Sequence, residues 1–237
     1  YLKQTSGIDD AISAMYLSKR SWTPEIDEDI RNTCDRLLNR RGFFQPKVDL
    51  DDLSKYNDWV DKTARWGWKH ITLLRFIDFS FVVQGLHRGG QDDWDSHSAR
   101  FNNRIIRNST RLARFGNEKS NWYKDKIITT DEAAAFLEIM MPETIEVNNI
   151  TYVRTVNGYV KEDCQNSNDA LRGLYMLSIP SDFIFKINLT EFGHVYKERN
   201  KNGSAHPEVK QCCEACADAI EAVYPQFNRE LFERIKN

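Results

Sequence analysis

The sequence has no long hydrophobic run. A helix that crosses a membrane needs about 18 or more consecutive apolar residues. The most apolar stretch, Phe76 to Leu86, is interrupted by Asp78, Ser80 and Gln84. The chain begins YLKQT, which is not the apolar core of a secretion signal and has no initiating methionine. We therefore expect no membrane association, a trimmed N-terminus and a place in the cytoplasm.

The sequence also lacks an excess of charge of either sign. Its 237 residues include 33 lysines and arginines and 35 aspartates and glutamates, for a formal net charge of −2. Proteins that bind nucleic acid through its phosphates carry a positive surplus. The balance argues against nucleic acid as the partner and leaves only a local basic groove open. Hydrophobic residues make up 41%, which is enough for a folded core.

The sequence contains few cysteines, and their number is odd. The five cysteines are Cys34, Cys164, Cys212, Cys213 and Cys216. Their number argues against a disulfide scaffold and for a reducing compartment. Cys213-Glu-Ala-Cys216 has the form of half a zinc or redox motif, yet apolar residues recur around it at helical spacing from Val209 to Val223. With no second pair at zinc spacing, we interpret these cysteines as core residues and predict no metal site.

The expected elements indicate an α+β fold with more helix than strand, in a single domain over residues 1–237. The first 65 residues read as helical, with one helix from Thr23-Pro24 to a C′ residue at Gly42 and another over 51–66. Strands are expected over 76–83, closed by Gly85, and over 183–187, with a hairpin over 145–160 turning at Asn157-Gly158. Further helices are expected over 133–140 behind a capping box at 129–132, and over 169–175, 190–199, 207–224 and 227–235.

No phosphate-binding loop, nucleophile elbow or Ser-His-Asp order is present. Gly85, Gly89 and Gly90 follow an expected strand but lack the spacing of a dinucleotide fingerprint. Arginine is the unusual feature of the next segment. Spacings of 4, 3, 4 and 3 residues would place five of them on one face if the segment is helical: Arg100, Arg104, Arg107, Arg111 and Arg114. Such a face is either a solvated surface or an anion site, because guanidinium binds phosphate through two hydrogen bonds.

A longer pattern runs from His70 to His97. The stretch from His70 to Phe81, followed by Gly85-Leu86-His87-Arg88, matches H-x-S-x-x-E-H…F-x-F…G-x-S-R without a gap. Continuing ungapped places Trp94 and His97 on Q-W-x-R-H-R, with serines at 96 and 98 in place of both arginines. These patterns resemble those of the flavin-dependent thymidylate synthases, the ThyX family. The E-H pair of the family falls on residues 75 and 76, Arg and Phe, and is lost.

The second half of the chain resembles the same family more closely. Arg172 to Asn188 is similar to A-R-x-x-L-P-x-x-x-x-T-x-F-x-x-x-x-N, and Asn188 to Arg199 to N-x-R-x-L-x-x-F-x-x-L-R, both at equal length. Ala205 to Val209 is similar to A-Q-x-E-I after one extra residue. The resemblance covers roughly Gly7 to the C-terminus and is firm over 70–100 and 170–225. It implies a nucleotide and flavin motif region over 70–115 and a second nucleotide-binding half over 170–225.

The central family motif, R-H-R-x-x-S-x-N-E-x-S-x-R-Y, is degraded, and two placements compete. The first keeps His97 and puts the closing S-x-R on Ser109-Thr110-Arg111, with Phe101-Asn102-Asn103 as the echo of F-N-E. The second puts S-A-R-Y on Ser98-Ala99-Arg100-Phe101 and the first arginine on Arg88. We prefer the first, because the match upstream of it is ungapped.

The resemblance implies that the protein makes dTMP from dUMP. Carbon would come from methylenetetrahydrofolate, a hydride from reduced FAD, and NADPH would reduce the flavin. Arg199 would be catalytic, because a fixed arginine stabilises the negative charge that develops on the uracil carbonyls. The implied dUMP-binding residues are Ser109, Arg111, Arg172 and Arg199, and the implied FAD-binding residues are His97, Asn102, Asn188 and His206. The family also implies a homotetramer encoded by a bacterium or a phage, and the two missing arginines imply weakened FAD binding.

Each of these residues also has a plain structural explanation. Asn188 can cap a helix, Arg199 suits a helix C-terminus, and His206 before a proline can be a loop residue. Three functions therefore stay open. The first is thymidylate synthesis, and the second is methylation or hydroxymethylation of another pyrimidine nucleotide. The third is non-catalytic binding of nucleotide or nucleic acid.

Overall fold

The computed structural model describes residues 1–96, 104–109, 118–136, 141–201 and 205–234. The chain forms two compact units that alternate along the sequence. Unit 1 consists of Tyr1–Val83, Asp93–Ile105 and Ile184–Asn237, and unit 2 of Gln84–Asp92 and Ile106–Phe183. The single domain expected over residues 1–237 stays a prediction. The predicted α+β fold with more helix than strand is confirmed by the order of the elements.

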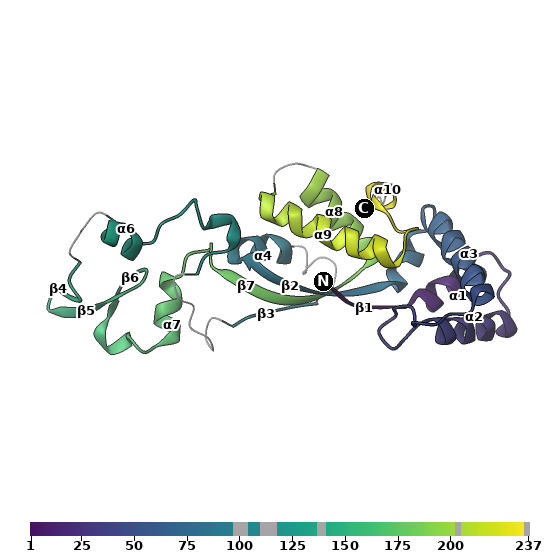
Figure 1. Cartoon of the computed structure of the whole chain (residues 1–237), viewed down its shortest axis with the longest axis horizontal. Coiled ribbons are helices and arrows are strands. Elements are labelled where there is room, and N and C mark those ends of the chain that lie inside the picture. The colour runs from purple at the N-terminus through teal and green to yellow at the C-terminus, as the bar shows by residue number, and fades with distance from the viewer. Residues whose placement is uncertain (97–103, 110–117, 137–140, 202–204, 235–237) are drawn as a thin grey trace. The chain divides into compact units, whose positions relative to one another are not determined.

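Three helices at the start of the chain pack against one another in unit 1 (Figure 1): α1 (Ile8–Ser18), α2 (Pro24–Leu37) and α3 (Leu50–Gly67). Thr23 Oγ1 accepts from Ile26 N at 3.3 Å and Pro24 is the first helical residue, as predicted for the start of α2. Asp49 caps α3 by accepting from the amides of Asp51 and Asp52. A 3₁₀ helix, η1 (Ile71–Phe76), follows.

A four-stranded sheet has the order β1-β2-β7-β3, with β1 (Leu2–Ser6), β2 (Asp78–His87), β7 (Pro180–Asn188) and β3 (Arg104–Arg107). Strand β1 pairs antiparallel with β2, opposing Thr5 to Phe79. In unit 1 the sheet is followed by α8 (Leu189–Tyr196), the π-helical segment η5 (Lys197–Lys201), α9 (Pro207–Val223) and α10 (Arg229–Arg234). Aromatic rings fill the core here, with Phe81 stacked on Phe185 at 5.0 Å between centroids and Phe192 edge-on to Phe232.

Unit 2 contains a separate three-stranded antiparallel sheet of order β4-β5-β6. Its strands are β4 (Thr144–Val147), β5 (Ile150–Thr155) and β6 (Gly158–Lys161). The predicted Asn157-Gly158 hairpin is confirmed as the β5–β6 turn. The other elements of unit 2 are η2 (Asn121–Tyr123), α6 (Thr130–Phe136), η3 (Glu162–Cys164), α7 (Asn168–Leu171) and η4 (Arg172–Leu174). Helix α4 (Arg88–Asp95) begins in unit 2 and ends in unit 1.

The capping box predicted before α6 is present. Thr129 N donates to Glu132 Oε2 at 2.6 Å, and Glu132 N donates to Thr129 Oγ1 at 3.3 Å. Lys119 adds an ion pair to the same carboxylate at 2.8 Å, with only 6% of the lysine side chain exposed. The Lys119 ammonium, followed by the capping contacts of Thr129, holds the pKa of Glu132 down at about 2.

Several expected elements differ from the structure. The first residues form strand β1 rather than helix. Helix α2 ends at Leu37, so Gly42 is not its C′ residue; an added Cβ at Gly42 would lie 2.3 Å from Thr5 O, which shows that glycine is needed for close contact with β1. Strand β2 continues through Gly85, whose φ is +76°, instead of ending there. Residues 104–107 form strand β3, so the arginines at 104 and 107 do not belong to a helical face.

The cysteine prediction holds in the α9 core. Cys213 and Cys216 are buried there. Burial raises the pKa of the Cys213 thiol well above its ordinary value, and a hydrogen bond with Cys212 together with burial does the same for Cys216. A raised pKa keeps both thiols protonated, as expected of core residues.

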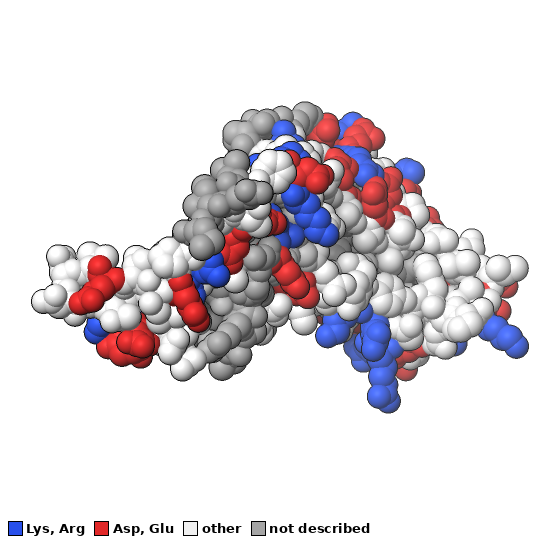
Figure 2. Space-filling view, turned by 60° about the vertical axis from the view of Figure 1, so that its left-hand side comes forward, with Lys and Arg blue, Asp and Glu red and all other residues white. Residues whose placement is uncertain are grey.

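Charges of both signs are mixed on the surface. On the face drawn in Figure 2, acidic and basic side chains are interspersed, in keeping with a formal net charge of −2. Among the helices that the structure describes, none has the length and apolar character needed to cross a membrane.

Candidate functional site

The candidate site in unit 1 centres on a break in helical geometry. Helix α8 ends at Tyr196 and continues as the π-helical segment η5, which contains Arg199. Two side chains tie this region to α9: the Tyr196 hydroxyl donates to Glu214 Oε1 at 2.9 Å, and the Asn200 amide donates to the same carboxylate. Segments of π-helix are rare and frequently occur at functional sites.

The guanidinium of Arg199 is held by the end of α4. Its Nη2 donates to the backbone carbonyl of Asp93 at 2.9 Å and to Ser96 Oγ at 2.8 Å. Its Nη1 lies 3.0 Å from the Asp93 carboxylate, and only 17% of the arginine side chain is exposed. These contacts join residues separated by more than 100 positions in the sequence. The two regions that carry the ThyX resemblance therefore meet at Arg199.

One nitrogen of this guanidinium lacks a hydrogen-bond partner among the described residues. Arg199 Nε is fully buried and makes no hydrogen bond within the described part of the chain. Arginine has five N–H donors and no acceptor, and leaving a buried donor unsatisfied costs about 1–3 kcal/mol. Native proteins tolerate such a group mainly where a ligand, a water or a function explains it. The unpartnered Nε–H is therefore the feature of this guanidinium that calls for a ligand, a water or a function to explain it.

Helix α4 is anchored beside Arg199 by its tryptophan. Trp94 is 3% exposed and packs edge-on against Phe185 of β7, with ring centroids 5.1 Å apart. Ser96 Oγ also donates to the Asp93 carbonyl at 2.8 Å. The core packing and this local hydrogen bond together fix the groups that hold Arg199.

Two other predicted site residues act as helix caps. Asn188 Oδ1 accepts from Glu191 N at 2.9 Å and caps α8, which is the structural role expected for it. His206 Nδ1 accepts from Glu208 N at 3.2 Å and caps α9. Each cap uses one acceptor atom of the side chain. Both side chains therefore have a structural role at the start of a helix.

The remaining predicted site residues are divided between unit 2 and the undescribed residues. Ser109 follows β3 and is exposed, and Arg172 begins η4. Near Ser109, Arg107 forms an ion pair with Asp92 of α4. The predicted residues that lie outside the described part of the chain are His97, Asn102 and Arg111. Both placements of the degraded motif depend on such residues and stay predictions.

Sequence reasoning did not select Asp93 and Ser96 as site residues, yet both contact Arg199. Asp93 occupies the glutamine position and Ser96 the first arginine position of Q-W-x-R-H-R. These two residues depart together from the family pattern. An acidic residue, Asp93, stands before the tryptophan, and the arginine expected at position 96 is replaced by serine. A positive charge elsewhere in the fold would explain that exchange, and Arg199 is this charge.

A family model described as thymidylate synthase complementing protein matches residues 6–226. The chain belongs to this family. The ThyX resemblance predicted from its motifs is thereby confirmed. No curated protein sequence shows significant similarity to the chain.

Solved structures share the fold of this ThyX family member. One is the flavin-dependent thymidylate synthase ThyX from Helicobacter pylori complexed with FAD and dUMP, with 14% identity and a TM-score of 0.53 over 100% of this chain and 98% of that one. Another is the UMP/dUMP methylase PolB from Streptomyces cacaoi bound with 5-Br dUMP, with 11% identity and a TM-score of 0.54 over 98% of this chain and 93% of that one. At such low identity the likeness shows the common fold.

Proposed function

We propose that this ThyX family member methylates dUMP at C5 to give dTMP, using methylenetetrahydrofolate as the carbon donor. Bound FAD, reduced by NADPH, would supply the hydride that completes the methyl group. The family match and the folds of the ThyX and PolB structures support a methylase acting on dUMP. At the level of single residues, the main support is the buried guanidinium of Arg199, whose Nε has no partner among the described residues.

Arg199 would bind a carbonyl oxygen of the uracil ring. The C5 carbon of uracil is a weak nucleophile until the ring becomes enolate-like, and negative charge then gathers on the ring oxygens. A buried, fixed positive charge stabilises this charge without having to reorganise during the reaction. Because the Nη atoms are already held by Asp93 and Ser96, the guanidinium is oriented before substrate binds.

The other predicted residues would bind and orient the two ligands. Arg172, Arg111 and Ser109 offer donors suited to the phosphate of dUMP. Asn188, His206, His97 and Asn102 would contact FAD. The Oδ1 of Asn188 forms the cap and its side chain also bonds the Glu191 carboxylate, so its remaining Nδ2 hydrogen would serve a carbonyl acceptor on the flavin.

The experiment is a flavin spectrum of the purified protein followed by turnover. We expect absorption typical of bound FAD, and a product of dTMP mass from dUMP in the presence of methylenetetrahydrofolate and NADPH. Product should be absent when either co-substrate is omitted. A colourless protein that is not activated by added FAD, and that makes no product, would contradict the proposal.

A second candidate is methylation of UMP. The PolB structure, a UMP/dUMP methylase, has a TM-score as high as that of the ThyX structure. Turnover with dUMP, UMP and dCMP in parallel, followed by product mass, distinguishes the candidates and detects hydroxymethyl transfer. A preference for UMP over dUMP would replace dTMP synthesis with this second activity.

We also propose a homotetramer in the cytoplasm. The family resemblance supports this assembly, and charged arginines are costly to bury unless a ligand or a neighbouring chain pairs them. Light scattering of the flavin-bound protein should give about four times the 27.7 kDa mass of one chain. A monomer that still holds flavin would exclude the tetramer.

A further inference from the structure

We propose that Asp93 is the positioning residue for Arg199, and that serine at position 96 makes this arrangement possible. The inference rests on the proposed function, because it concerns the guanidinium that would contact the base. It assigns a role to two residues at which this chain departs from the pattern of its family.

Asp93 holds Arg199 through two different groups. Its carboxylate lies 3.0 Å from Nη1, and its backbone carbonyl accepts from Nη2 at 2.9 Å. Ser96 Oγ accepts from Nη2 as well, at 2.8 Å. Because the guanidinium is rigid and planar, contacts at two of its nitrogens fix both its plane and its rotation within that plane.

This arrangement selects which N–H group is presented to a ligand. Both hydrogens of Nη2 are used, and Nη1 faces the carboxylate, whereas Nε has no partner among the described residues and is fully buried. If Asp93 were absent, the Nη atoms would also compete for an acceptor. The aspartate therefore reserves the Nε–H for the substrate oxygen.

The residue at 96 decides whether the arrangement can form. An arginine here, as in the family pattern, would bring a second guanidinium against Arg199, and two like charges at such short range in a partly buried site repel strongly. Serine supplies an acceptor for Nη2 and a donor for the Asp93 carbonyl. Serine in place of arginine at position 96 would thus weaken flavin binding and at the same time supply the last contact that orients Arg199.

The test compares Asp93→Asn, Asp93→Glu, Ser96→Ala and Ser96→Arg. Asp92→Asn is the matched control, because Asp92 is an ion-paired aspartate one position earlier on α4 whose partner is Arg107. The flavin-bound proteins are compared in kcat and KM for dUMP, in flavin content and in thermal unfolding. Loss of a group that orients a functional residue typically costs about 10- to 100-fold.

We expect Asp93→Asn to lower kcat by about this factor while KM for dUMP and flavin content change little. Asp93→Glu should recover part of the loss because it restores the charge, and Ser96→Ala should have a smaller effect of the same kind. Ser96→Arg should lower kcat even if it tightens FAD binding. The Asp92→Asn control should match the unaltered protein.

A second readout does not depend on turnover. In proton–nitrogen spectra of the arginine side chains, the buried Nε–H of Arg199, assigned by its loss in Arg199→Lys, should exchange slowly with solvent. Asp93→Asn should accelerate its exchange and Asp92→Asn should not. Unchanged exchange together with unchanged kcat in Asp93→Asn would overturn the proposal, as would losses of activity that only follow losses of thermal stability.

The two proposals fail in different ways. A protein that neither binds flavin nor methylates a nucleotide would refute the proposed function, and the exchange of Arg199 Nε–H would still decide whether Asp93 positions it. If Arg199→Lys abolishes turnover but Asp93→Asn has no effect, only the positioning role is wrong.

Discussion

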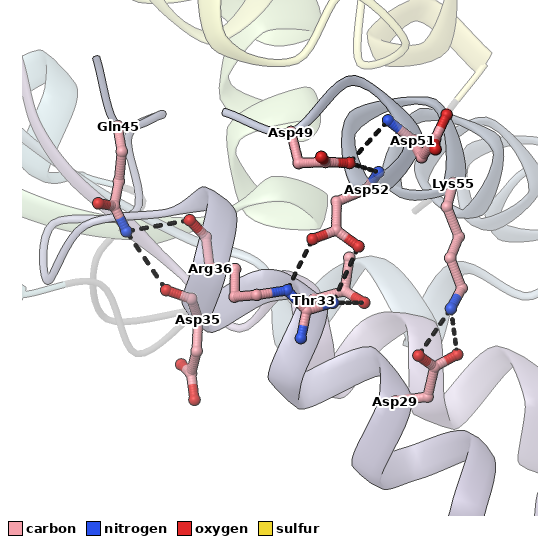
Figure 3. A network of polar contacts seen from close by, with 9 residues as sticks. All are labelled: Asp29, Thr33, Asp35, Arg36, Gln45, Asp49, Asp51, Asp52 and Lys55. Carbon is pink, nitrogen blue, oxygen red and sulfur yellow. Dashed lines mark hydrogen bonds and ion pairs between the residues drawn. The ribbon is translucent and has the colours of Figure 1, made fainter. Parts of the chain in front are cut away.

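Two arginine–aspartate pairs in unit 1 join neighbouring elements and differ in which N–H donors of the arginine remain unused. In the α2–α3 network, Arg36 donates from Nε and Nη2 to the two carboxylate oxygens of Asp52 at 2.6 and 2.8 Å (Figure 3). Arg199 instead uses only its Nη atoms for Asp93, and its Nε has no partner in the part of the chain that the structure describes. The Arg36 side chain is 56% exposed, whereas that of Arg199 is 17% exposed.

The rest of the α2–α3 network is also internally satisfied. Lys55 lies within 2.6 Å of both carboxylate oxygens of Asp29, and the Gln45 amide donates to the carbonyls of Asp35 and Arg36 at the end of α2 (Figure 3). The ion pairs of this network lie in an exposed setting, where such pairs contribute little. An arginine that is buried and held through only part of its donor set is therefore the one suited to a ligand.

The largest difference should appear when each arginine is removed. We expect Arg199→Ala to lower turnover of dUMP by roughly a hundredfold or more, about 3 kcal/mol of transition-state stabilisation, while flavin remains bound. Arg36→Ala should leave turnover unchanged. Steady-state kinetics and the flavin spectrum of both variants provide the measurement. Unchanged activity of Arg199→Ala would remove this residue from the site and undermine the alignment of the second half of the chain.

The ion pair of Lys119 with Glu132 has one buried partner. Its removal shows whether burial of one partner is enough for an ion pair to raise the free energy of unfolding. The pKa of Glu132 is lowered in the folded protein to about 2 from an ordinary 4.5, first of all by Lys119. A carboxylate with a lowered pKa stabilises the fold above its unfolded pKa, and this stabilisation is lost as the pH falls from 4.5 towards 2. We expect the urea midpoint to fall over this range, and Glu132→Gln to show a smaller fall.

The matched control for that experiment is Asp163→Asn. Asp163 also has a lowered pKa, caused first by Lys161, but both members of this pair are well exposed. Its removal should change the acid dependence less than Glu132→Gln does. Equal effects of the two substitutions would mean that the burial of Lys119 contributes nothing.

The smallest effect is expected at the exposed Arg36–Asp52 pair itself. Arg36→Ala should shift the urea midpoint slightly at low salt and less at high salt, because salt screens exposed charges. Unfolding in urea at two salt concentrations measures this. A large shift that does not depend on salt would show that the arginine acts through packing of its side chain, and that the two pairs differ less than their exposure suggests.

Local sequence signals predicted the elements whose causes lie within a few residues. The Thr23-Pro24 helix start, the Thr129–Glu132 capping box and the Asn157-Gly158 turn all formed as expected. Distant partners explain the errors. Strand β1 exists because β2, over 70 residues away, offers a pairing edge, and Gly42 is required by contact with Thr5 rather than by the end of a helix.

The candidate site also combines features that depend on local sequence with features that depend on distant partners. The resemblance to the family's motifs selected Arg172, Asn188, Arg199 and His206, and the match over residues 6–226 then confirmed the family. Only the tertiary structure placed Asp93 and Ser96 against Arg199, because a hydrogen bond across 106 positions leaves no periodic trace in either segment. Helix caps and turns are determined by neighbours along the chain. The direction of the Nε–H of a buried guanidinium is determined by the residues that the fold packs around it.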